Sequence, residues 1–216
     1  MKYFVLTVGR LLHWESSPAD GGRYDMSQSC PRCGTGAVRI DPLFVAPSRC
    51  LAGVAGTYLQ QLLVSKDVYE QLFAVGVRSL RQAVDRKGRE PVDFWSLEPE
   101  RSLSPWSKDS SGFERSEMDP PCSKCHRDGY YDIPKQSLKL SYDSMPPVQI
   151  CATWEHFGAS RLRVPFEKSL FATPRFIVSE LVHDVLCSCQ GIGFDEVRIT
   201  APNQSSQPTR AFGPRG

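Results

Sequence analysis

Several short segments of the chain have the hydrophobic pattern of β-strands. Some run apolar over strand length and others alternate apolar with polar residues, the period of two that a half-buried strand requires. A proline interrupts one of them at Pro42, which predicts a short, broken strand. The strands expected on this basis are residues 3–8, 37–46, 92–97, 162–166 and 191–199.

Two further segments have the period of an amphipathic helix. Ser65 is a good helix N-cap, and Val68, Leu72 and Val75 follow it on one face until Gly76 can end the helix. Ser179 is placed in the same way before a second helix. The apolar face of that second helix consists of Leu181, Val182, Val185, Leu186 and Cys189.

The two helical segments resemble each other in what surrounds them. Each reads as a capped helix, a glycine stop and a strand, with Gly76 after the first helix and Gly191 after the second. Such units are common in any α/β protein, so a duplicated half-domain and a chance likeness both stay open. The fold class predicted is α/β (α+β), a mixed sheet with a few packed helices and possibly two related halves.

Other segments have no such period. Residues 99–121 are rich in Ser, Pro and charge and predict a long exposed loop, and residues 138–157 read as irregular. Residues 201–216 hold Pro, Ser, Gln and Gly without a core pattern, which predicts a disordered tail. We therefore expect one domain over residues 1–200.

Composition and charge exclude several protein classes. The 216 residues are 40% hydrophobic and 23% charged, which fits a globular domain and not a coiled coil or a disordered chain. No apolar run reaches the roughly 20 residues that a bilayer requires, and the N-terminus does not read as a signal peptide. We expect a cytoplasmic protein. The net charge of +2 argues against a dedicated nucleic-acid binder. The one basic cluster, read as a solvated face, is Arg78, Arg81, Arg86, Lys87 and Arg89.

Two cysteine pairs have the spacing of metal ligands. Cys30 and Cys33, and then Cys122 and Cys125, each enclose two residues, and two such pairs can form a tetrahedral zinc site. Between the pairs lie 88 residues, far more than in a zinc ribbon. Loop closure costs only about 0.6 kcal/mol per doubling of length, so this gap does not forbid a shared site. We expect one structural zinc ion bound by these four residues.

Alternatives to zinc remain at this stage. One pair could be a redox dithiol, or the four thiols could be metal-free. The remaining cysteines are expected not to bind metal: Cys187 and Cys189 would point apart on a helix, while Cys50 and Cys151 stand alone as buried thiols. No phosphate-binding loop, nucleophile elbow or metalloprotease motif occurs, and Trp154-Glu155-His156 has no partner motif, so we do not expect an enzyme.

The two knuckles, CPRCG at residues 30–34 and CSKCH at 122–126, together with the segment Thr173–Ser179 before a helix, resemble the double-CXXCG motif family of bacterial proteins. Several members of that family are grouped as Sit-type immunity proteins. The resemblance covers roughly residues 1–200 and carries over Cys30, Cys33, Cys122 and Cys125. His126 departs from it, because the second motif would have glycine there.

The resemblance implies a cytosolic protein that binds and neutralises a cognate toxin domain by occlusion. Such an interface concentrates its energy in a few aromatic anchors. We expect Trp106 and Phe113, within the 99–121 loop, to contact the partner toxin. The alternative function is a zinc-binding nucleic-acid or transcription-associated module, which the knuckles and the basic cluster would support. A third is an oxidoreductase that uses Cys30 and Cys33.

Overall fold

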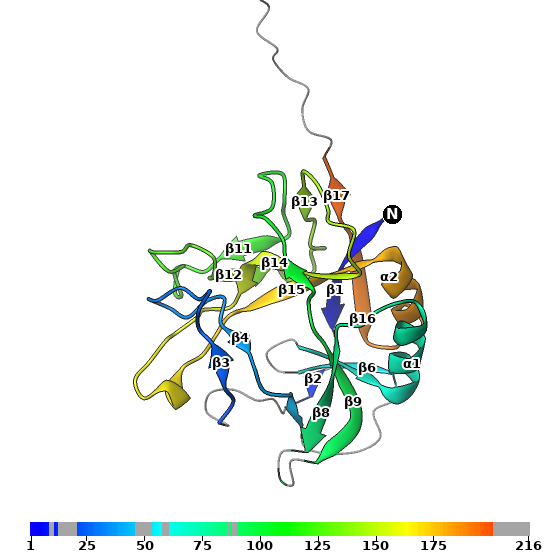
Figure 1. Ribbon diagram of the computed structural model, residues 1–216. Coiled ribbons are helices and arrows are strands. Elements are labelled where there is room, and N and C mark those ends of the chain that lie inside the picture. Colours follow the sequence, from blue (N-terminus) through cyan, green and yellow to red (C-terminus); the bar gives the residue numbers. More distant parts are fainter. Residues whose placement is uncertain are drawn as a thin grey trace, which may run out of the picture.

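A computed structural model describes residues 1–8, 11–12, 21–45, 53–57, 61–85, 87 and 90–200 (Figure 1). The predicted tail at 201–216, Cys50, and Arg86 and Arg89 of the basic cluster lie outside these residues. About 40% of the chain is strand and 11% is helix, so the expected mixed sheet with helices is present but β-structure dominates. Among the described residues, neither helix is long and apolar enough to cross a bilayer.

Two curled mixed sheets form the body of the molecule. In spatial order, the larger sheet consists of β2 (Leu11–Leu12), β6 (Val54–Thr57), β7 (Leu62–Ser65), β9 (Pro91–Leu97), β8 (Leu80–Asp85) and β5 (Phe44–Val45). The smaller consists of β10 (Arg101–Ser102), β14 (Ile150–Phe157), β15 (Thr173–Ser179), β1 (Tyr3–Val8) and β16 (Ile192–Glu196). Three two-stranded pairs complete the strands: β3 (Tyr24–Asp25) with β4 (Val38–Arg39), β11 (Phe113–Arg115) with β12 (Tyr130–Asp132), and β13 (Ser141–Tyr142) with β17 (Arg198–Ile199).

The strand pairings show that the chain contains one pattern twice. In the larger sheet β9 lies antiparallel between β7 and β8, and in the smaller sheet β1 lies antiparallel between β15 and β16. β2 joins the edge of β6 in parallel, as β10 joins the edge of β14. The parallel pair of β5 and β8 likewise recurs as β13 and β17. We call β1 to β8 with α1 the first repeat, and β9 to β17 with α2 the second repeat.

The two repeats exchange their first strands. β9 belongs to the second repeat but completes the sheet of the first, and β1 does the reverse. The likeness noted between the two helix–Gly–strand segments is therefore part of a correspondence along the whole described chain. Each sheet is therefore completed by a strand from the other repeat.

Both helices lie side by side on one flank of the molecule (Figure 1). α1 (Lys66–Ala74) follows β7, and α2 (Glu180–Leu186) follows β15. The Ser179 hydroxyl accepts a hydrogen bond from the Val182 amide, as an N-cap should, whereas Ser65 occupies the N-cap position without such a bond. Both serines thus begin helices where the sequence predicted them.

One shared core lies between the helices and the two sheets. It draws equivalent residues from both repeats, all of them buried. The equivalent pairs are Leu6 with Leu97, Val54 with Ile150, Val64 with Val178, Val68 with Val182, and Leu72 with Leu186. Smaller clusters cover the outer faces of the sheets, around Ala55 and Leu63 on one and around Cys151 and Ile177 on the other.

Three sequence predictions about local structure are wrong. Residues 162–166 are not a strand but part of a connection between β14 and β15 with one 3-10 turn, Phe166–Lys168. Residues 138–157, read as irregular, contain the eight-residue strand β14. It is buried along almost its whole length, so it lacks the alternation of a half-exposed strand. The predicted loop 99–121 contains β10 and part of the hairpin of β11 and β12.

Candidate metal centre

Each repeat presents one cysteine pair on a turn inside a two-stranded hairpin. The Cys30–Cys33 pair lies between β3 and β4, and the Cys122–Cys125 pair lies between β11 and β12. The two turns close with the same hydrogen bond: the amide of Gly34 donates to the Cys30 carbonyl at 2.8 Å, and the amide of His126 donates to the Cys122 carbonyl at 2.9 Å. The two knuckles are thus equivalent parts of the two repeats.

His126 stands where the first knuckle has Gly34, and it keeps the same turn. Its φ is 55°, in the left-handed region that Gly34 also occupies with a φ of 83°. Non-glycine residues adopt this region at some cost, and histidine does so more readily than most. The departure from the CXXCG pattern therefore does not change the geometry of the second knuckle.

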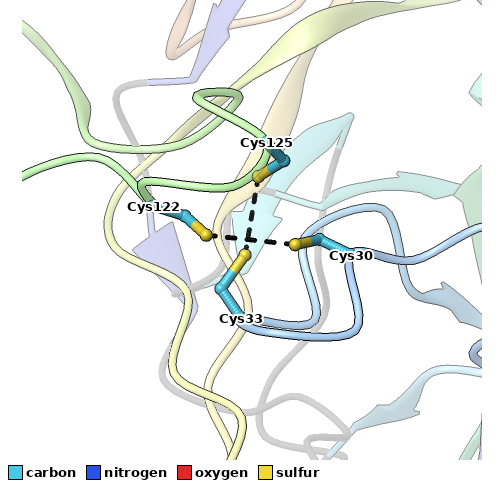
Figure 2. A group of neighbouring side chains, drawn as sticks. All are labelled: Cys30, Cys33, Cys122 and Cys125. Carbon is cyan, nitrogen blue, oxygen red and sulfur yellow. Dashed lines mark hydrogen bonds between the residues drawn. The ribbon is translucent and has the colours of Figure 1, made fainter.

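The four thiols converge on one point (Figure 2). All four sulfurs lie within 4.8 Å of one another. The Sγ atoms of Cys30 and Cys122 are 3.9 Å apart, and those of Cys33 and Cys125 are 3.6 Å apart. Each of these contacts joins equivalent residues of the two repeats. The two pairs are 88 residues apart in the sequence because each repeat contributes one of them.

These distances fit a tetrahedral metal site and not disulfides. A disulfide would hold two sulfurs at about 2.05 Å. Four thiolates around zinc, with Zn–S bonds of about 2.3 Å, would lie about 3.8 Å from one another, and the sulfur distances of 3.6 Å and 3.9 Å bracket that value. The cluster could hold a metal ion, and no other group of this kind occurs among the residues that the structure describes.

The surroundings of the thiols supply donors to sulfur. The amide and hydroxyl of Thr35 lie 3.5 Å and 3.0 Å from the Cys33 sulfur, and the Lys124 amide donates to Cys122 at 3.5 Å. Burial alone would raise the pKa of Cys30, but the amides of Arg32 and Cys33 donate to its sulfur and bring that pKa to about 7. Burial raises the pKa of Cys33 and of Cys125. Packed this closely, four thiolates need a cation between them.

A buried carboxylate that the sequence did not indicate organises the second knuckle. Asp128 is 2% exposed, and its two oxygens accept hydrogen bonds from the Cys122 amide at 2.8 Å and the Ser160 amide at 3.0 Å. It thereby ties the knuckle to the connection between β14 and β15. No periodicity marks such a residue, because its role depends on a contact with a distant segment.

That connection also packs on the first knuckle. Phe171 touches the turn so closely that a β-carbon at Gly34 would come within 2.3 Å of its ring. Phe166 and Phe171 also contact Tyr24 of β3. Fifteen residues join β14 to β15, whereas only four join β6 to β7 in the first repeat. The longer connection braces both cysteine hairpins.

The other three described cysteines are not part of the site. Cys187 is exposed at the end of α2, Cys189 is half-buried beside Gly53, and Cys151 is fully buried in β14, as expected for a packed thiol. All seven described cysteines are free.

The two aromatic residues proposed as partner contacts are packed together elsewhere. The rings of Trp106 and Phe113 lie 4.5 Å apart, and Trp106 also contacts Tyr130 and Phe157. Both are half-buried against the outer cluster of the smaller sheet, so they are not presented on an exposed loop as the sequence predicted. Their contact with a partner stays a prediction.

Compared with known proteins, the chain matches no family model, and no curated protein matches it.

Proposed function

We propose that this chain is an immunity protein that binds and neutralises a cognate bacterial toxin domain, and that one zinc ion fastens its two repeats together. One observation carries the proposal. The two CXXC motifs on which the resemblance to double-CXXCG immunity proteins rests form a single four-cysteine cluster. The separate motifs of the sequence thus have a common structural purpose.

Zinc is the metal that this ligand set favours. Soft thiolate ligands in a tetrahedral arrangement select zinc or iron–sulfur clusters and disfavour magnesium and calcium. A zinc ion with four thiolates carries two negative charges, and Arg32, Arg161 and Arg163 line a surface hollow beside Cys33 and Cys122. Their positive charge offsets that of the bound site. The ion would have a structural role, because four protein ligands leave no open coordination position for catalysis.

Occlusion of a toxin requires a rigid complementary surface. Trp106 and Phe113 are held by neighbouring rings and keep part of their surface exposed. Aromatic side chains fixed before binding lose little conformational entropy in a complex, which is the usual property of an interface anchor. We therefore retain this pair as the proposed contact with the toxin.

A direct test begins with the genes adjacent to that of this protein, and a candidate toxin domain encoded there is expressed with and without this chain. Bacteria that express that toxin domain should grow only when this chain is co-expressed, and the purified proteins should form a stoichiometric complex in light scattering and calorimetry. Protection without a complex would exclude occlusion. A complex without protection would exclude immunity.

Nucleic-acid binding is the second candidate, and the arginines beside the cysteine cluster favour it. Against it, Arg161 pairs with Asp119, and Arg78 and Arg81 of the basic cluster donate to backbone carbonyls of Phe73 and Ile40. A salt titration separates the two functions. Counterion release makes the affinity of a nucleic-acid binder for DNA fall by orders of magnitude between about 50 and 200 mM salt. Such a fall in the affinity for a DNA duplex would support the second candidate.

A further inference from the structure

A cavity of about 460 Å³ lies behind the first cysteine hairpin, where the two repeats meet. β14 and β15 form one wall, the end of β9 forms another, and the cysteine hairpins of both repeats contribute to its rim. Its apolar wall consists of Leu97, Ala152, Pro174 and Phe176. The volume lies within the roughly 300–1,000 Å³ of small-molecule sites.

One arginine in this cavity forms no ion pair with any described carboxylate. Arg39 and Glu98 also line it, but they neutralise each other through a hydrogen-bonded ion pair of 2.9 Å. Arg127 lies three residues before β12, the return strand of the second hairpin. It has no carboxylate within 4.0 Å in the described part of the chain. Among the described residues that line the cavity, Arg127 is therefore the cation that forms no ion pair, although its charge also acts at longer range on the buried Glu155.

The Arg127 side chain is held by Trp154 and also lies close to Gly36, where a β-carbon would come within 2.9 Å of its Nη1. Its Nε donates to the Trp154 carbonyl at 3.1 Å, and its guanidinium lies 4.9 Å from the centre of the Trp154 ring. The terminal nitrogens make no further hydrogen bond to a described residue. A guanidinium fixed through Nε in this way can donate two parallel hydrogen bonds to a carboxylate or a similar anion.

A hydrogen-bond acceptor lies in the same cavity. His156 lines it, and the Nδ1 atom of that ring is 3.0 Å from the Trp154 carbonyl. A carbonyl only accepts, so Nδ1 carries the proton and Nε2 is the free acceptor of a neutral ring. The ring is 5% exposed, and burial lowers the pKa of His156 to about 4, consistent with a neutral imidazole.

We propose that this cavity binds a small organic anion with a flat apolar body. Its anionic group would lie on Arg127, and its body would cover the wall formed by Leu97, Ala152 and Phe176. The inference goes beyond the proposed immunity function and does not depend on it, since toxin neutralisation requires only the outer surface.

The test compares two ligands of the same shape. Full-length, metal-loaded protein is titrated calorimetrically with 2-naphthoate and with 2-naphthalenemethanol, which has the same rings without the charge. We expect one saturable site per chain for naphthoate and at least tenfold weaker binding of the alcohol. In Arg127→Gln, naphthoate should bind no better than the alcohol.

Two more variants make the result decisive. Arg198→Gln removes the same charge from an exposed residue of β17 and should leave naphthoate binding unchanged. Ser102→Phe places a ring into the cavity from an exposed position and should abolish binding while Arg127 remains. Equal affinity for acid and alcohol, unchanged binding in Ser102→Phe, or no saturable binding would each overturn the proposal. The first two readouts decide the matter even if Arg127→Gln fails to fold.

Discussion

The ring of Phe4 stacks on the imidazole of His183, with centroids 4.1 Å apart and planes 20° from parallel. The other exchanged strand makes the equivalent contact: Trp95 of β9 stacks on Tyr69 of α1 at 4.4 Å and 17°. In each case a residue on the exchanged strand meets a residue four positions after the serine N-cap of the helix. The exchanged strands are thus fastened to the helices by aromatic pairs.

Loss of this stack should weaken the fold. We expect His183→Ala to lower the free energy of unfolding by about 1 kcal/mol, the usual value of an aromatic pair. His183→Phe should restore most of it, because the ring is retained. His183 also contacts Asp184 at 3.0 Å, so Asp184→Asn serves as the control for the ion pair. Urea denaturation of the three variants measures these differences. An alanine variant as stable as the parent would show that the stack contributes nothing.

The metal centre yields a second prediction. Purified without chelator, the protein should contain one zinc ion per chain by elemental analysis. Cys33→Ser and its equivalent Cys125→Ser should both lose the ion and lower the melting temperature sharply, because the free energy of metal binding is part of the free energy of folding. Cys187→Ser is the matched control, since that thiol is exposed and remote from the cluster. Absence of metal with four freely titrating thiols would contradict the shared site.

Trp106 should contribute to stability as well as to any interface. Its ring contacts Phe113, Tyr130 and Phe157, so Trp106→Ala removes packing from the outer cluster. Because the residue is half-buried, we expect a loss of about 2 kcal/mol, below the 3–5 kcal/mol of a fully buried aromatic. Trp106→Phe should keep most of the stability. Because Trp106→Phe stays folded, a loss of affinity for the toxin in this variant would report on the interface and not on packing.

A buried carboxyl group predicts a pH dependence of stability. Glu155 is 3% exposed; one oxygen accepts from the Trp106 amide, and the other has no partner among the described residues. Burial raises the pKa of Glu155 from 4.5 to about 7. The folded state therefore holds its proton over a range in which the unfolded chain has lost it. The contribution of Glu155 to stability is greatest below pH 4.5, falls as the pH rises toward 7, and changes no further above it, a total of about 3 kcal/mol.

Glu155→Gln should remove this dependence. His156 acts in the opposite direction, because burial lowers its pKa and its protonation destabilises the fold as the pH falls. The measurement is accordingly the difference in unfolding free energy between parent and variant from pH 5 to 8. The unfolding free energy of Glu155→Gln should increase relative to that of the parent as the pH rises. A constant difference would mean that the carboxyl group of Glu155 titrates normally.

Gly34 offers a test of how the first knuckle is braced. Gly34→Ala should cost more stability than Gly21→Ala, although both residues have a positive φ, of 83° and 79°. Only at Gly34 would the new β-carbon meet another group, the Phe171 ring, whereas nothing lies within 4 Å at Gly21. Equal losses in the two variants would show that Phe171 moves aside freely.

The sequence predicted those features that depend on local pattern or on ligand chemistry. Ser65 and Ser179 were recognised as helix starts because capping is a local preference. The convergence of the four cysteines was predictable because two CXXC pairs together supply the four thiol ligands of one metal site. β14 could not be recognised, since a strand buried on both faces has no alternation. Asp128 and Arg127 could not be recognised either, because each acts through segments distant in the sequence. The exchange of β1 and β9 is likewise invisible to any local pattern.

That exchange has a consequence for synthesis on the ribosome. β1 leaves the exit tunnel more than 160 residues before its neighbours β15 and β16. At about 5–20 residues per second, the nascent strand waits of the order of ten seconds or more for its partners. During that interval its apolar residues and open edges are available to chaperones or to other chains. The yield of folded protein in cells should therefore depend on how well β1 is protected until β15 and β16 have been synthesised.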